Sequence, residues 1–106
     1  LMLATPAWAG FDEGLAAARR GDYATALREW RPLAEQGYAK AQDKVGLRYE
    51  RGEGVIKDEV QALAWTMRAA DQGFAAAIER RGVLIERLDA GDVAEAERLV
   101  RERRQR

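Results

Sequence analysis

The sequence of 106 residues contains no cysteine, no histidine and no serine. Without cysteine, the chain can form neither a disulfide framework nor a thiolate nucleophile. Without histidine, it lacks the commonest general base and the commonest metal ligand, so zinc sites built from cysteine and histidine are excluded. An enzyme with this composition would depend on Asp, Glu, Lys, Tyr or Thr. We therefore expect no catalytic residues, no metal site and no other cofactor.

The charges also lack a dominant sign, because 18 Lys and Arg residues balance 18 Asp and Glu residues. Proteins that bind nucleic acid usually carry a basic excess, so we expect no nucleic-acid partner. No stretch is long and apolar enough for an integral membrane segment. Only the end of the chain is locally basic, with Arg101, Arg103, Arg104 and Arg106. These side chains could grip phosphate or lipid headgroups, but the simpler interpretation is favourable placement of cations at a helix C-terminus.

Proline is scarce, and β-branched residues are few, whereas Ala, Leu, Arg and Glu dominate. Those four residues have high helix propensity, so the composition predicts one small all-α domain. Pro32 falls inside an expected helix, where it removes a backbone donor and should kink the helix near Arg28.

The amino-terminal segment, residues 1–9, is apolar and uncharged. It ends in Ala7-Trp8-Ala9, which fits the small-x-small cleavage pattern of a secretory signal peptide. The alternative is an ordinary apolar start of a helix. We interpret residues 1–9 as a signal-peptide remnant, so that residues 10–106 form the domain and the protein is periplasmic or secreted.

Two segments of the chain align without gaps at an offset of 36 residues. Gly37 and Gly73 each end an Ala-x-Gln-Gly sequence and precede an aromatic residue, and Gly46 and Gly82 have the same spacing. A fixed period of this length is typical of stacked-repeat proteins. We expect Gly37 and Gly73 to lie just past helix ends with positive φ. The predicted units are residues 11–37, 38–73 and 74–106.

Each unit is predicted to contain two helices. Gly52 suits the left-handed position after a helix, and Asp22, Asp58 and Asp92 suit the N-cap position. The last helix has one apolar stripe and an otherwise charged surface, as a terminal capping helix of a solenoid needs. The expected helices span residues 11–20, 23–36, 40–51, 59–72, 75–89 and 93–104.

The longest motif covers the central unit: Ala41-Gln42-x-x-Val45-Gly46-Leu47-x-Tyr49-x-x-Gly52-x-Gly54-Val55-x-x-Asp58-x-x-x-Ala62-x-x-Trp65-x-x-x-Ala69-Ala70-x-Gln72-Gly73. On these residues the chain resembles the Sel-one-like repeat family, a relative of the tetratricopeptide repeats, and looser matches extend over residues 11–106. The resemblance implies a short right-handed α-α superhelix of about two and a half helix-turn-helix repeats plus a C-terminal capping helix. It also implies structural roles for Gly37, Gly46, Gly52, Gly54, Asp58, Trp65 and Gly73.

The tetratricopeptide pattern places the first helix of each unit on a concave groove. The predicted groove has mixed charge and two apolar centres, which suits an extended or helical peptide. A plain solvated surface is the alternative. The predicted groove residues are Arg19, Lys40, Asp43, Leu47, Glu50, Arg51, Glu79, Val83, Glu86 and Arg87.

Four large aromatic residues, Trp30, Tyr49, Trp65 and Phe74, fall where stacked helices bury side chains. We expect them in the core and not in a ligand site. Our leading functional hypothesis, from the resemblance, is a protein-protein interaction module or scaffold of the bacterial cell envelope. Its partner would be a protein or peptide. The alternatives are an envelope hydrolase or an inhibitor of a wall enzyme, and a fragment of a longer solenoid.

Overall fold

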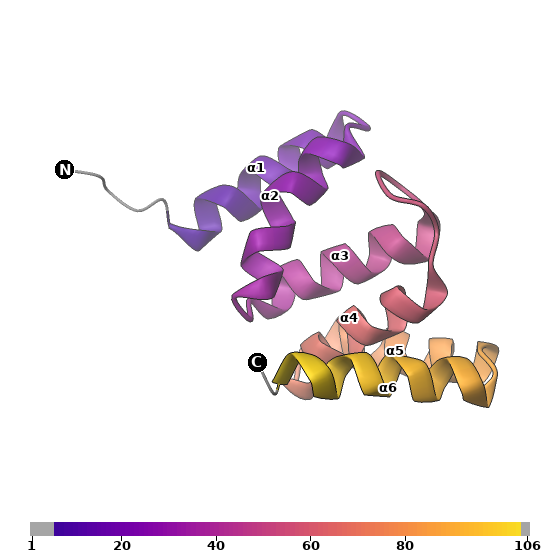
Figure 1. Ribbon diagram of the computed structural model, residues 1–106. Coiled ribbons are helices and arrows are strands. Elements are labelled where there is room, and N and C mark those ends of the chain that lie inside the picture. The colour runs from indigo at the N-terminus through magenta and orange to yellow at the C-terminus, as the bar shows by residue number, and fades with distance from the viewer. Residues whose placement is uncertain (1–5, 105–106) are drawn as a thin grey trace.

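Six helices and no strand account for the regular structure of residues 6–104, which is the part of the chain that this computed structural model describes (Figure 1). The prediction of an all-α fold is confirmed. The first and last helices begin earlier than the expected residues 11 and 93, and the other four begin within one residue of the prediction. The helices are α1 (Ala7–Arg19), α2 (Tyr23–Glu35), α3 (Ala39–Arg51), α4 (Glu59–Asp71), α5 (Ala75–Arg87) and α6 (Ala90–Arg104).

Acidic residues cap the starts of α2, α4 and α6. The side chains of Asp22 and Asp58 each accept a hydrogen bond from the backbone N–H three residues later, as predicted. The predicted cap at Asp92 is wrong. In its place, Asp89 accepts from the Asp92 N–H at 2.8 Å, because α6 begins already at Ala90 after a short turn.

Glycines with positive φ mark the helix ends. Gly37 and Gly73 follow α2 and α4 with φ of 98° and 84°, which confirms the prediction. Gly52 ends α3 in the left-handed conformation. Gly54, in the next loop, has φ of 81°, and a Cβ there would meet the backbone carbonyl of Tyr23 at 2.7 Å. This loop therefore packs directly on the first residues of α2.

The helix α2 runs through Pro32 to its end at Glu35 and changes direction along its length (Figure 1). The bend agrees with the predicted effect of the missing backbone donor.

The proposed signal segment falls partly outside the described residues, which begin at Pro6. Its last residues, Ala7-Trp8-Ala9, form the first turn of α1, and the Trp8 side chain is exposed. Cleavage after Ala9 would shorten α1 by this turn and would leave Phe11, the first core residue of the helix, in place.

The largest core cluster lies between the first four helices. Trp30 and Trp65 are only 1% and 3% exposed and pack with Phe11, Leu27 and Val45, among others. The Trp30 indole also donates a hydrogen bond to the buried Phe11 carbonyl at 3.1 Å, which satisfies its one polar atom. The expected core positions of these two tryptophans are confirmed.

The other two predicted core aromatics are only half-buried. Tyr49 accepts a hydrogen bond from Arg31 at 2.9 Å, and Phe74 packs beside a small alanine cluster. Phe74 belongs to the first residues of the last unit, where no helix covers it completely.

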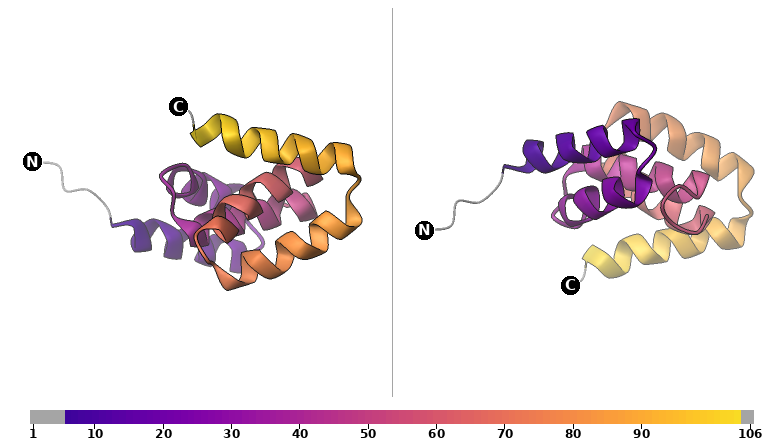
Figure 2. Two further views of the ribbon diagram at one scale, coloured as in Figure 1. Left: turned by 90° about the horizontal axis from the view of Figure 1, so that it is seen from below. Right: turned by 90° about the horizontal axis from the view of Figure 1, so that it is seen from above.

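The last helix pair departs from the repeat. Consecutive helices pack on one another from α1 to α5, but α6 packs mainly on α4 and only marginally on α5. The two helices diverge from the connection Leu88–Asp89 with α4 between them (Figure 2). Ala96 and Val100 bury the inner stripe of α6 in a second core cluster with Leu63 and Leu84. The helix α6 thus covers α4, while the packing between the two helices of the third unit is weaker than in the first two units.

Candidate functional site

The first helices of neighbouring units, α3 and α5, border a shallow depression of about 370 Å³. We call it the α3–α5 groove. Five of its residues come from the predicted groove, so the structure brings these sequence-distant positions together. The lining residues are Leu47, Glu50, Arg51, Ala76, Glu79, Arg80 and Val83.

Ion pairs neutralise part of this groove. Arg80 Nη1 lies 2.5 Å from Asp43 Oδ1, and the Asp43 side chain is almost fully buried. Glu50 lies 3.8 Å from Arg80 and 3.5 Å from Arg87. Asp43 therefore does not offer a free charge, because its carboxylate pairs with Arg80. Sequence reasoning missed Arg80, although it lies 37 positions after Asp43, close to one repeat period.

The rest of the α3–α5 groove is available to a partner. Val83 is 54% exposed, and Leu47 is half-buried beside it in the same depression. Arg51 and Glu79 are exposed, and neither pairs with an ionic group among the described residues. The groove thus offers an apolar centre flanked by two free charges of opposite sign.

A second depression, of about 320 Å³, lies between α1 and α3 and shares Ala76 with the α3–α5 groove. We call it the α1–α3 depression. Its walls are apolar, with Phe11, Leu15 and Phe74, and Lys40 and Lys44 stand at its edge. Of the residues that line it, the predicted groove included Lys40 and Asp43 but not Phe11, Leu15 or Phe74. The four-residue spacing of Phe11 and Leu15 on one helix was the available signal.

The remaining predicted groove residues lie apart from both depressions. Arg19, at the end of α1, and Glu86 are exposed. Arg87 is used in ion pairs with Glu50 and, at 3.0 Å, with Glu59 at the start of α4. The line of predicted groove residues is therefore shorter than expected. The concave surface continues instead into the α1–α3 depression, which Phe11 and Phe74 line.

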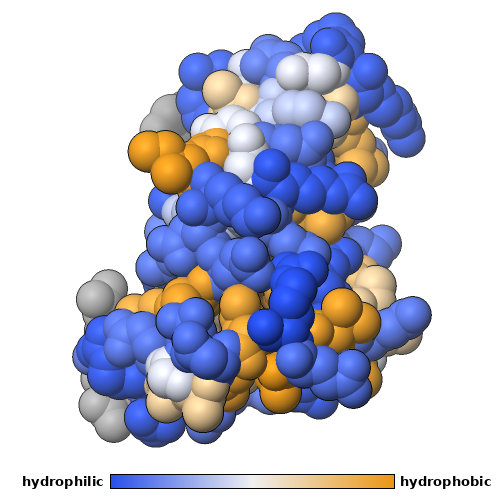
Figure 3. All heavy atoms as spheres, turned by 90° about the vertical axis from the view of Figure 1, so that its right-hand side faces the viewer, coloured by the Kyte–Doolittle hydropathy of each residue, from blue (hydrophilic) through white to orange (hydrophobic). Residues whose placement is uncertain are grey.

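The molecular surface is mostly hydrophilic. In Figure 3, apolar residues gather mainly in the lower half of the view, where α4, α5 and α6 lie. Within residues 6–104, no three acidic side chains are grouped so that they could hold a metal ion. None of the helices in this range combines the length and apolarity needed to cross a bilayer.

Stacked helix pairs with a 36-residue period and grooves between their first helices define a helical-repeat protein of the α-solenoid class. A crystal structure with the same fold is that of a protective antigen present in uropathogenic Escherichia coli strains, which displays an SLR fold. The TM-score is 0.81 and the sequence identity 31%, over 92% of this chain and 22% of that one. The chain therefore has the Sel-one-like repeat (SLR) fold, and the match supports the family resemblance of its central motif.

The chain spans about a fifth of the length of that antigen, with 22% covered. No protein-family model and no curated protein sequence matches the chain. The SLR fold is typical of scaffolds that bind other proteins.

Proposed function

We propose that the chain is a non-enzymatic protein-interaction module whose concave face binds an extended or helical segment of a partner protein. This face consists of the α3–α5 groove and the α1–α3 depression, which meet at Ala76. The observation that carries the proposal is the exposed Val83 beside Leu47, between the free charges of Arg51 and Glu79.

The arrangement suits peptide recognition for two physical reasons. Apolar anchors surrounded by polar residues are where binding energy concentrates in protein interfaces. Free charges of opposite sign fix the register of a partner, because a mismatched charge is repelled. Both depressions are shallow, whereas a catalytic carboxylate pair needs an enclosed site that separates the two pKa values.

The location of the module is also a proposal. Ala7-Trp8-Ala9 supports export to the bacterial envelope, because it fits a signal-peptidase site. The partner would then be an envelope protein or a secreted one.

The test exchanges the two free charges with the variant Arg51→Glu/Glu79→Arg. The exchange keeps the net charge and leaves the core untouched, so stability should change by less than about 0.5 kcal/mol. Glu50 is unsuitable for this purpose because it pairs with Arg80 and Arg87. The variant should fold, as judged by circular dichroism, and should lose a partner that the wild-type chain captures from an envelope extract.

A matched control exchanges the paired charges Glu95 and Arg98 on α6. That variant, Glu95→Arg/Arg98→Glu, should retain the partner with wild-type affinity. If the groove variant also retains it at that affinity, the concave face is not the binding site.

A further inference from the structure

Three arginines converge on the side of the molecule formed by the second helices of the units. Arg68 of α4 and Arg103 and Arg104 of α6 line a depression of about 310 Å³ between α2, α4 and α6. We call these three residues the arginine cluster. The end of α2, the start of α3 and the end of α4 also contribute to the lining, with Glu35, Gln36, Gln42, Asp71 and Gln72. The chain as a whole has no net charge, so this concentration of guanidinium groups is a local feature.

The arrangement of the cluster is fixed by aromatic stacking. The guanidinium carbons of Arg68 and Arg103 lie 4.4 and 4.8 Å from the centre of the Trp65 ring, which is buried. Arg68 also donates to the Leu99 carbonyl at 3.1 Å, which ties α4 to α6. Stacking on the ring holds the two guanidinium groups close together, so their charges are concentrated at one place on the surface.

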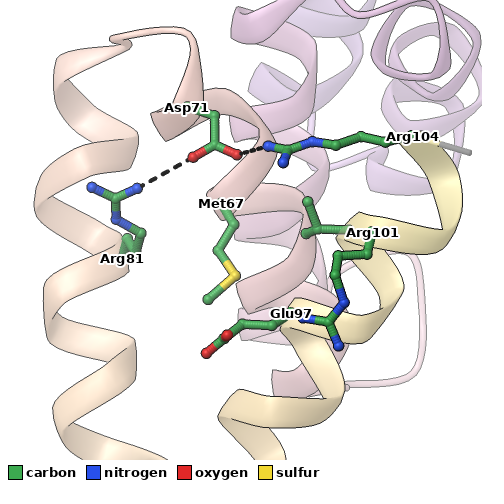
Figure 4. A pocket seen from close by; sticks show the side chains of 7 residues that line it. Met67, Asp71, Arg81, Glu97, Arg101 and Arg104 are labelled. Carbon is green, nitrogen blue, oxygen red and sulfur yellow. Dashed lines mark hydrogen bonds and ion pairs between the residues drawn. The ribbon is translucent and has the colours of Figure 1, made fainter.

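The three positive charges of the cluster face two carboxylates in the same depression, Glu35 and Asp71. The cluster's one ion-pair partner among the described residues is Asp71, which binds Arg104 and is shared with Arg81 (Figure 4). Arg103 has no ion-pair partner in that range. The buried Nε of Arg68 has no acceptor. Such groups are costly to leave without partners.

The proximity of the three positive charges affects the pKa of Arg68. Burial, together with repulsion from Arg103 and Arg104, lowers the pKa of the Arg68 guanidinium to about 10. Arg68 stands in the last turn of α4, and the two arginines that repel it come from α6. A bound anion would relieve the repulsion.

We propose that the arginine cluster binds a phosphate group, carried either by a soluble phosphomonoester or by a lipid headgroup. A phosphate dianion offers several oxygens to two or three guanidinium forks, which a single carboxylate cannot. The site is separate from the concave face, since it shares no lining residue with the α3–α5 groove or the α1–α3 depression.

The first experiment titrates inorganic phosphate into the full chain at constant ionic strength. The readout is the NMR signal of the Trp65 indole N–H, with that of Trp30 as an internal reference. Saturable binding should move the Trp65 signal alone. Arg103→Gln should weaken binding by about tenfold or more, because it removes a charge-assisted contact.

Arg101→Gln is the matched control, because Arg101 is on the same helix but lines the neighbouring depression with Met67 and Glu97 (Figure 4). It should leave phosphate binding within about twofold of wild type, since no contact of the cluster changes. Absence of a saturable shift in the wild-type chain would overturn the proposal. Equal weakening by the two substitutions would also overturn it, since it would indicate general charge attraction.

Vesicles then distinguish the two sources of phosphate. If the ligand is a lipid, the wild-type chain should co-sediment with phosphatidylcholine vesicles that contain phosphatidic acid. The Arg103→Gln variant should not co-sediment with them, and free phosphate should compete with the vesicles for the wild-type chain. If the chain binds inorganic phosphate with the predicted sensitivity and does not sediment with the vesicles, the ligand is a soluble phosphomonoester.

Discussion

The central helix pair α3–α4 and the last pair α5–α6 contain the same landmark glycine but pack differently. A Cβ added at Gly46 would meet Thr66 Oγ1 at 2.8 Å and the Ala62 carbonyl oxygen at 3.1 Å. A Cβ added at Gly82, one period later, would meet nothing within 4 Å. Gly46 permits the close approach of two helices, whereas Gly82 lies opposite no helix. The same sequence landmark therefore has a structural role in one unit only.

The connections between the helices explain this difference. The central pair is joined by residues 52–58, where Gly52 and Gly54 adopt positive φ and reverse the chain. The last pair is joined by Leu88–Asp89 alone, and neither residue has positive φ. Without a left-handed residue, the chain does not fold α6 closely back along α5, so α6 packs mainly on α4.

The largest expected effect comes from the core of the well-packed region. Trp65→Ala should lower the free energy of unfolding by about 3–5 kcal/mol, because it removes a buried ring from the largest core cluster. Urea denaturation measures this loss. The matched substitution in the last pair, Val100→Ala, should cost about 1–2 kcal/mol. Similar losses at both positions would contradict the difference between the regions.

The ion pair between Asp43 and Arg80 joins the two regions, since it links α3 to α5. Asp43→Asn should destabilise the protein by about 2 kcal/mol, less than a fully buried pair would lose, because Arg80 is partly solvated. A double-mutant cycle with Arg80→Gln should give a coupling of about 1 kcal/mol or more. Additive effects would show that the pair does not connect the units.

The two landmark glycines should respond to alanine with opposite signs. Gly46→Ala should destabilise by about 1–3 kcal/mol, because the new methyl group pushes α3 from α4. Gly82→Ala should stabilise by up to about 1 kcal/mol, because it only raises helix propensity. Thermal and urea unfolding of the two variants measure the signs. Destabilisation by Gly82→Ala would mean that α6 packs closely on α5 after all.

The smallest expected effect concerns the helix caps Asp58 and Asp89. Asp58→Ala should cost about 1 kcal/mol, because α4 is held on several sides and cannot fray independently. Asp89→Ala should cost only about half as much, because the exposed first turn of α6 can open without the core. Hydrogen exchange of the first-turn amides provides the same comparison. Equal losses of stability in the two variants would contradict the conclusion that α6 is packed less firmly than α4.

Local sequence signals determined much of the secondary structure of this protein. Helix propensity, the caps at Asp22 and Asp58 and the glycines Gly37 and Gly73 act within a few residues, so the sequence predicted the helices and most of their ends. The period of 36 residues placed Leu47 and Val83 on neighbouring first helices, and both line the α3–α5 groove. Their role in binding stays a prediction.

Side-chain pairing was less predictable. The sequence contains both Asp43 and Arg80, but repeat spacing does not tell which of several nearby charges a flexible arginine reaches. The cap of α6 was misassigned for a related reason, since Asp89 and Asp92 have equal local propensity. The turn geometry decides between them.

Only the tertiary structure decided where α6 lies. The apolar stripe with Ala96 and Val100 could cover any apolar surface, and the connection Leu88–Asp89 directs it to α4. That placement brings Arg103 beside Arg68, 35 positions earlier in the chain and outside the repeat alignment. The sequence of one segment does not show which surface it will pack on, because burial of its apolar side chains is favourable against any apolar surface of suitable shape.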